Sequence, residues 1–187
     1  MLLLQGERQE NETMFAVTER LLLRPGWIED APELASAIGD KDIARNLTRV
    51  PFPYSEGDAE AFLTLPHDPL RPRFLICLRD SNRIVGGIGL SGDAEPELGY
   101  WIARDHWGRG YATEAGRAVV ALADGSLRLP KVRARRMLDN ARSANVLRKL
   151  GFQPTGKTAW SASLVRGTVE TSLYTREREE DPQALAA

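Results

Sequence analysis

Residues 107–112 read Trp107-Gly108-Arg109-Gly110-Tyr111-Ala112 and join an expected strand, Glu95–Ala103, to an expected helix, Tyr111–Ala123. Two glycines at such a junction let the backbone approach a ligand closely, because neither carries a Cβ. The first N–H groups of a helix have no partner inside it and form a cradle for an anion. The stretch therefore predicts a site for a phosphate-bearing cofactor. A tight turn whose glycines only relieve backbone strain is the alternative interpretation.

A second stretch follows downstream and reads Asn140-Ala141-Arg142-Ser143-Ala144-Asn145-Val146-Leu147-Arg148-Lys149-Leu150-Gly151-Phe152. Together the two stretches resemble the GNAT N-acetyltransferases, which transfer an acetyl group from acetyl-CoA to an amine. The patterns W-G-x-G-Y-A-T-E-A and N-x-x-S-x-x-V-L-x-K-L-G-F are similar to the RimJ/RimL-like branch, named for enzymes that acetylate ribosomal-protein N-termini. The start, Thr18–Pro25, is similar to the same branch, and the resemblance runs from about Val17 to Arg176.

The resemblance implies a set of residues that bind acetyl-CoA. Backbone N–H groups from the first stretch would hold the pyrophosphate, with Trp107 standing where the wider family has Arg or Gln. Asn140 would contact the pantetheine arm, or it is a turn residue that bonds its own backbone. Lys149, with Arg148, would meet the 3′-phosphate, or both are placed favourably near a helix C-terminus. The full set expected to bind the cofactor is Trp107, Gly108, Arg109, Gly110, Tyr111, Ala112, Asn140, Ser143 and Lys149.

Acetyl transfer to an amine needs a group that removes a proton from the ammonium. We expect Glu97 to be this base, because its strand would flank the acetyl group; an exposed strand carboxylate is the alternative. Glu95 and Glu114 are weaker candidates, and an acid in the first turn of a helix, like Glu114, also complements the helix dipole.

The departing thiolate and the developing oxyanion must also be stabilised. Many family members carry a Tyr where this chain has Leu147, whose side chain cannot supply a proton. The resemblance to the RimJ/RimL-like branch implies that the Ser143 hydroxyl hydrogen-bonds the sulfur instead; a helix cap is the alternative role, and one hydroxyl can serve in both. A backbone N–H near Tyr100 or Trp101 would serve the oxyanion, with Gly99 permitting a bulge. The two aromatic side chains themselves are expected to pack rather than to contact substrate.

The order of expected elements is one strand, two or three helices, three strands, a helix, a strand, a helix and two strands. It predicts an α+β fold with helices on a mostly antiparallel sheet. A helical crossover links Glu95–Ala103 to Val132–Leu138, as parallel neighbours require. The resemblance implies a GNAT-like mixed, twisted sheet with helices on both faces, in which this parallel pair splays apart to admit the cofactor. Other expected segments are the strand Phe15–Leu23, the helices Trp27–Ile38, Asp42–Leu47, Glu56–Leu65 and Ser143–Leu150, and the strands Phe74–Leu78, Arg83–Leu90, Phe152–Thr158 and Thr168–Arg176.

Length and composition indicate one soluble globular domain. The chain has 187 residues, 42% hydrophobic and 27% charged, with a net charge of −1 that gives no reason to expect nucleic-acid binding. We expect a domain over 15–176, a mobile extension over 1–14 and a frayed tail over 177–187. No apolar run approaches the roughly 20 residues that span a bilayer, so no membrane partner is expected.

Cysteine and histidine usage adds two expectations. The single cysteine, Cys77, lies in an apolar run and should pack in the core. No disulfide can form within the chain, which favours a reducing, cytoplasmic compartment. The only histidines, His67 and His106, are too few for a histidine-rich metal site.

The expected function is acetyl-CoA-dependent N-acetylation of a primary amine by direct attack within a ternary complex. The acceptor stays open among a protein N-terminus, an antibiotic amine, an amino acid and a polyamine. A non-catalytic acyl-CoA-binding module and a purely structural α/β domain are the alternatives. Family habit allows a homodimer.

Overall fold

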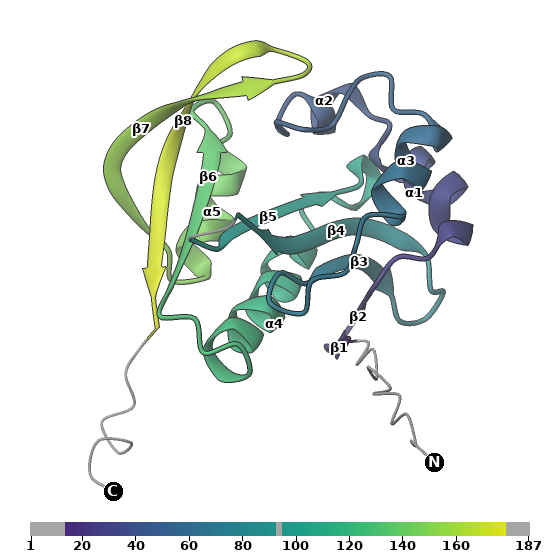
Figure 1. The fold of residues 1–187 in the computed structure, drawn as a ribbon, viewed down its shortest axis with the longest axis horizontal. Helices are drawn as coiled ribbons and strands as arrows, with labels where there is room; N and C mark the ends of the chain where they lie inside the picture. The colour runs from purple at the N-terminus through teal and green to yellow at the C-terminus, as the bar shows by residue number, and fades with distance from the viewer. Residues whose placement is uncertain (1–13, 93–94, 179–187) are drawn as a thin grey trace, which may run out of the picture.

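The computed structural model describes residues 14–92 and 95–178 of the chain. Within them lie the strands β1 (Ala16–Val17), β2 (Leu21–Arg24), β3 (Arg73–Leu78), β4 (Ile84–Ser91), β5 (Glu97–Ile102), β6 (Lys131–Met137), β7 (Gln153–Ser163) and β8 (Gly167–Glu177). They form one sheet in the order β1-β2-β3-β4-β5-β6-β8-β7, in which only β5 and β6 are parallel (Figure 1). The expected mixed, mostly antiparallel sheet is confirmed.

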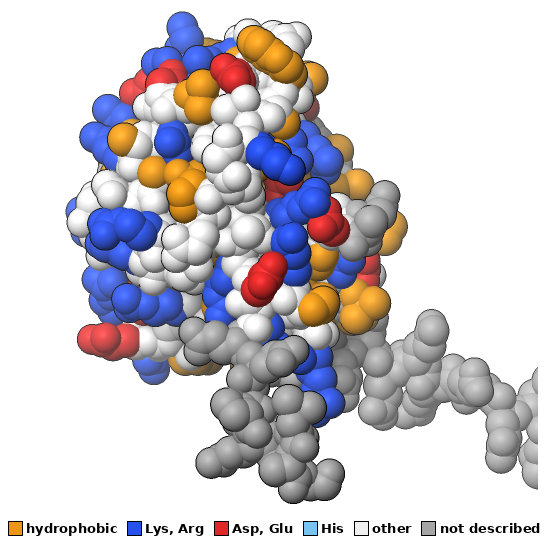
Figure 2. Space-filling model, turned by 90° about the vertical axis from the view of Figure 1, so that its left-hand side faces the viewer, with side chains coloured by type: hydrophobic (Ala, Val, Ile, Leu, Met, Phe, Trp, Pro, Cys, Tyr) orange, Lys and Arg blue, Asp and Glu red, His pale blue; other side chains and the backbone are white. Residues whose placement is uncertain are grey.

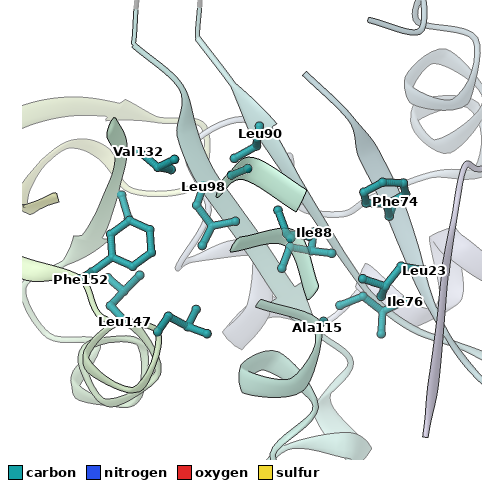
Figure 3. Close-up of a cluster of buried hydrophobic side chains, with 14 of the residues drawn as sticks. Leu23, Phe74, Ile76, Ile88, Leu90, Leu98, Ala115, Val132, Leu147 and Phe152 are labelled. Carbon is teal, nitrogen blue, oxygen red and sulfur yellow. The ribbon is translucent and has the colours of Figure 1, made fainter. Parts of the chain in front are cut away.

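Helices cover both faces of the sheet, as the resemblance implied. The described helices are α1 (Ala31–Ile38), α2 (Lys41–Ala44), α3 (Glu56–Leu63), α4 (Tyr111–Gly125) and α5 (Ala141–Lys149), with 3-10 turns η1 (Ile28–Asp30) and η2 (Arg104–His106). On one face, α1 and α3 pack on Leu75 and Cys77 of β3. On the other, Ala115 of α4 and Leu147 of α5 meet Ile88, Leu98 and Val132 in the larger core (Figure 3). Successive strand residues point to opposite faces, so the strands β2 to β5 contribute to both cores.

Local sequence explains where the helices next to the site begin and end. The buried residues of α4 include Ala115, Val119 and Ala123, which recur every four residues and form one apolar stripe. Asn140 caps the start of α5, and Gly151, with φ of 82°, follows its end in the left-handed conformation that glycine adopts readily. These signals fix both helices against the sheet.

Several boundaries differ from the expected ones. The segment Phe15–Leu23 was expected as one strand, but it contains the two short strands β1 and β2 joined by a turn. The turn is closed by a hydrogen bond of 2.9 Å from the Thr18 N–H to the Leu21 carbonyl. The helix expected from Trp27 begins at Ala31, after η1. Met14 packs against the core and Glu177 ends β8, so the folded body passes the expected bounds at both ends. The rest of the expected extension and tail, residues 1–13 and 179–187, lies outside the described residues.

The parallel pair separates after two residues. β5 pairs with β6 only at Glu97↔Arg133 and Leu98↔Ala134. Beyond Leu98, β5 stays on β4 as far as Ile102, while β6 stays on β8. The expected splay is therefore confirmed. Gly99 would permit a bulge, but β4 and β5 pair there without a register shift; the divergence of β5 from β6 leaves the β5 edge unpaired instead.

Three further observations bear on function. Cys77 is buried in the core as expected, and burial raises the pKa of its thiol to about 11. Among the helices that the structure describes, none is long and apolar enough to cross a bilayer. No cluster of metal-ligating side chains occurs within residues 14–92 and 95–178.

Candidate active site

A cleft of about 1240 Å³ lies where β5 and β6 diverge. The N-terminal ends of α4 and α5 line one side of it, and residues 42–48 line another. Every residue of the expected site except Arg109 contributes to the lining: Glu97, Trp107, Gly108, Gly110, Tyr111, Ala112, Asn140, Ser143 and Lys149. The Arg109 side chain is exposed outside the cleft, and Arg148 is not among the lining residues.

The glycine turn presents free backbone donors at the start of α4. Gly108 and Gly110 have φ of 77° and 84°, a left-handed conformation that glycine adopts without strain. No acceptor among the described residues binds the amides of residues 108–112, whereas those of Thr113 and Glu114 bond to the Gly110 carbonyl. A Cβ built on Gly108 would meet nothing within 4 Å. Free amides beside open space at a helix N-terminus fit a diphosphate.

Trp107 is held across the mouth of the cleft by three contacts. Its indole N–H donates to the Ile102 carbonyl at 2.6 Å. The guanidinium carbons of Arg104 and Arg142 lie 4.4 and 5.0 Å from its ring centroid, within the range of cation–π attraction. Trp107 therefore connects the end of β5 with the start of α5.

Asn140 caps α5 and keeps a donor free. Its Oδ1 accepts from the Ser143 backbone N–H at 3.0 Å, so the interpretation as a residue bonding its local backbone is correct. Its Nδ2 has no partner among the described residues and is available to a ligand. Ser143 is not the cap of this helix, because Asn140 takes that position.

The Ser143 hydroxyl instead meets Tyr100, a residue that sequence reasoning assigned to packing. Tyr100 Oη lies 2.9 Å from Ser143 Oγ. Burial raises the pKa of Tyr100 to about 12, so the phenol stays protonated at neutral pH. The sequence carried one signal that could have predicted this contact. Side chains alternate along a strand, so Tyr100 lies on the same face of β5 as Leu98, and that face is directed toward α5.

Of the three candidate carboxylates, only Glu97 reaches the cleft. Arg135 Nε lies 2.8 Å from both Glu97 oxygens, and Arg135 Nη2 lies 2.6 Å from Oε2. Arg135 therefore fixes the position of the Glu97 carboxylate at the cleft. Glu95 pairs with Arg133 elsewhere on the surface.

Glu114 is a structural group. Burial alone would raise the pKa of this carboxyl, but hydrogen bonds from the Thr18 hydroxyl, the Arg20 backbone and the Arg20 guanidinium outweigh it and lower the pKa. Glu114 thus fastens the β1–β2 turn to α4. His106 is a lining residue that the sequence did not single out; its pKa is lowered, first by burial and then by Arg109, which favours a neutral imidazole.

The sheet divides at its parallel pair, and a helix start with free backbone donors lies at this division. Residues 20–153 match the model of the acetyltransferase (GNAT) domain. The chain therefore belongs to the GNAT acetyltransferase family and is an acyltransferase. A curated relative from Bacillus licheniformis, "Uncharacterized N-acetyltransferase p20", is 29% identical over 153 residues, which cover 78% of this chain and 84% of that protein.

Solved structures share the fold over most of the chain. A GNAT-family acetyltransferase from Bacillus anthracis has a TM-score of 0.78 at 22% identity and covers 89% of this chain and 100% of its own. The ribosomal-protein-S5-alanine acetyltransferase from Vibrio fischeri has a TM-score of 0.76 at 17% identity, covering 89% and 98%. The microcin C7 self-immunity acetyltransferase MccE, solved with acetyl-CoA and AMP, has a TM-score of 0.74 at 17% identity, covering 86% and 93%.

Proposed function

We propose that this protein acetylates a primary amine with acetyl-CoA by direct attack within a ternary complex, as a RimJ/RimL-like member of the family. The observation that carries the proposal is the row of free amides at residues 108–112, which opens onto the gap between β5 and β6. The likeness of fold to a ribosomal-protein acetyltransferase supports the branch. Acetyl-CoA would supply an acetyl group activated as a thioester.

The cofactor would be held along the α4 and α5 side of the cleft. The amides of residues 108–112 bind its diphosphate, where their partial positive charges add to the helix dipole. The free Nδ2 of Asn140 donates to the pantetheine arm. Lys149, exposed at the end of α5, meets the remaining phosphate.

Two proton-handling groups lie on either side of the gap. Glu97, held by Arg135, accepts the proton of the acceptor ammonium directly or through one water. Ser143 donates its hydroxyl proton to the departing sulfur as the carbon–sulfur bond breaks. The Tyr100 phenol, which is protonated at neutral pH, passes its proton to Ser143 through their hydrogen bond and takes a proton from solvent water when CoA leaves. No covalent enzyme intermediate is required, because the acceptor and the cofactor reach the gap from opposite faces.

The test combines binding with turnover. CoA should raise the melting temperature, and acetyl-CoA should release free thiol only when an amine from a panel is present. Mass spectrometry after incubation with acetyl-CoA alone should find no acetylated protein. Binding of CoA without turnover of any amine would favour the non-catalytic acyl-CoA-binding module. If CoA did not change the melting temperature, the proposed cofactor site itself would be refuted.

A further inference from the structure

We propose that the acceptor is a small primary amine that carries an anionic group, a carboxylate or a phosphate, within a few bonds of its nitrogen. Arg135 and Arg45 would receive that group, while Glu97 receives the ammonium. The inference rests on the proposed function and narrows it to one substrate class.

The acceptor side of the cleft follows from strand alternation. Leu98 of β5 and Ala134 of β6 face the core beneath α4 and α5. Glu97 comes one residue before Leu98 and Arg135 one residue after Ala134, so both face the opposite side of the sheet. The proposed contacts with the diphosphate and the pantetheine arm lie at the N-terminal ends of α4 and α5. The Glu97–Arg135 pair thus faces the side from which an acceptor enters.

The charged side chains that line the cleft differ between its two sides. The basic ones are Arg45, Arg104, Arg135, Arg136, Arg142 and Lys149, and the acidic ones are Asp42, Glu97 and Asp139. Arg142 and Lys149 belong to α5, on the side proposed for the anionic cofactor. On the acceptor side Arg135, Arg104 and Arg45 pair with Glu97, Asp42 and Asp139, so preference for an anion there depends on the donors that these pairs leave free. Basic side chains are also spread over the outer face of the molecule on the β7 side (Figure 2).

Arg135 retains donors for a ligand. A guanidinium has five N–H groups. The Nε hydrogen and one on Nη2 are directed at Glu97, and one on Nη1 at Ser161 Oγ, 3.1 Å away, which leaves two without a partner among the described residues. The contact with Ser161, a residue of β7, also fixes the orientation of the Arg135 guanidinium. Arg135 is therefore a positioned anion donor beside the group that would take the ammonium.

Arg45 is a second cation that lines the cleft, and its ion-pair partner Asp139 neutralises only part of its charge. Asp139 is shared by Arg166 at 3.1 Å and Arg45 at 3.4 Å. The hydrogen bond from Arg166 is the main cause that lowers the pKa of Asp139, and Arg45 contributes least. One carboxylate facing two guanidiniums leaves a net positive charge, and of the two only Arg45 lines the cleft.

Two hydrogen bonds hold the segment after α2 to the β7–β8 hairpin on the Arg45 side of the cleft. The tip of the hairpin lies next to this segment (Figure 1): Leu164 N–H bonds to the Thr48 carbonyl at 3.1 Å, and Ser163 Oγ to the Leu47 carbonyl at 3.4 Å. Leu47 and Thr48 line the cleft together with Arg45. These contacts therefore help to position the Arg45 side of the acceptor region.

The experiment compares matched amines in acetyl-CoA turnover. The matched pairs are phosphoethanolamine with ethanolamine, and 4-aminobutyrate with its carboxamide. Spermidine is included as a polycation, and a short acidic peptide tests for a peptide acceptor. We expect the anionic member of at least one pair to have kcat/KM about 10- to 100-fold above its neutral partner, as a charge-assisted contact provides. Arg45→Gln should reduce this ratio toward one. Arg117→Gln, which removes an exposed charge of α4 outside the cleft, should preserve it.

A second readout does not depend on catalysis. The anionic amine should raise the melting temperature of the CoA complex of the wild type, and should do so less in Arg45→Gln. Equal turnover of neutral and anionic amines, preference for spermidine or for the peptide, or a ratio unchanged in Arg45→Gln would overturn the inference while leaving the acetyltransferase proposal intact. If no amine were turned over and none shifted the melting temperature, the acetyltransferase proposal would fall as well.

Discussion

Tyr100 and Ser143 join β5 to α5 across the splayed strands, with their hydroxyl oxygens 2.9 Å apart. We expect Tyr100→Phe to lower kcat at least about 10-fold, because the hydroxyl that replenishes the Ser143 proton is lost. The dissociation constant of acetyl-CoA should stay within about twofold, since Tyr100 is not assigned to the cofactor phosphates. Assays of thiol release measure kcat, and a binding titration measures the dissociation constant of acetyl-CoA.

Tyr54→Phe is the matched control for that change. Tyr54 is another phenol whose pKa burial raises to about 12, and it does not line the cleft. Its substitution should leave kcat unchanged. Equal losses in the two variants would assign the effect of Tyr100→Phe to packing and not to proton supply.

The glycine turn allows a paired test of cofactor binding. Gly108 and Gly156 both have positive φ, and a Cβ at either would meet nothing within 4 Å. Alanine should therefore cost each site a similar backbone strain of about 1–2 kcal/mol. Only Gly108→Ala should weaken acetyl-CoA binding, by about 10-fold or more, because its Cβ would stand where the diphosphate approaches. Equal affinities in the two variants would argue against this turn as the phosphate site.

Glu97→Gln should lower kcat by about 100-fold or more while changing the KM for acetyl-CoA little, because a proton acceptor is lost from the acceptor side. Glu95→Gln is the control, since Glu95 also pairs with an arginine of β6 but does not line the cleft. The pH–rate profile is the measurement. A Glu97→Gln enzyme with wild-type kcat from about pH 6 to about pH 9 would remove Glu97 from the role of base.

Glu114 predicts a pH-dependent contribution to stability. Its pKa is lowered in the fold below the ordinary value of 4.5, so its ionised form is stabilised on folding. That contribution is fully present above 4.5 and is lost as pH falls through the lower folded value. Glu114→Ala should cost about 1–2 kcal/mol at neutral pH, discounted for the half-exposed Arg20, and progressively less below pH 4.5.

Urea unfolding at neutral pH and under acid conditions measures this difference. Glu60→Ala on α3, which removes an exposed carboxylate with no ion pair among the described residues, should show almost no change at either pH. A cost at Glu114 that did not diminish in acid would indicate lost packing in place of lost ionic hydrogen bonds.

The sequence predicted the mixed sheet and the parallel pair because strand patterns and a helical crossover are local signals. The family resemblance implied nine residues that would bind the cofactor, and eight of them line one cleft. The motifs that carry the resemblance are short stretches of sequence, so they could be read without knowledge of the fold. The sequence could not predict that Tyr100 meets Ser143 or that Arg135 holds Glu97. Those contacts span 43 and 38 positions in sequence, and they depend on how far two strands diverge.

Arg20 lies in the turn between β1 and β2, yet its guanidinium binds Glu114, the Arg109 carbonyl at 3.0 Å and the face of the Tyr111 ring. The glycine turn that would bind the cofactor is therefore held in its conformation by the β1–β2 hairpin. Ordering of this turn is accomplished during folding, so little entropy remains to be lost when the diphosphate arrives. A protein shortened past Arg20 would keep every cradle residue and still capture its cofactor less tightly.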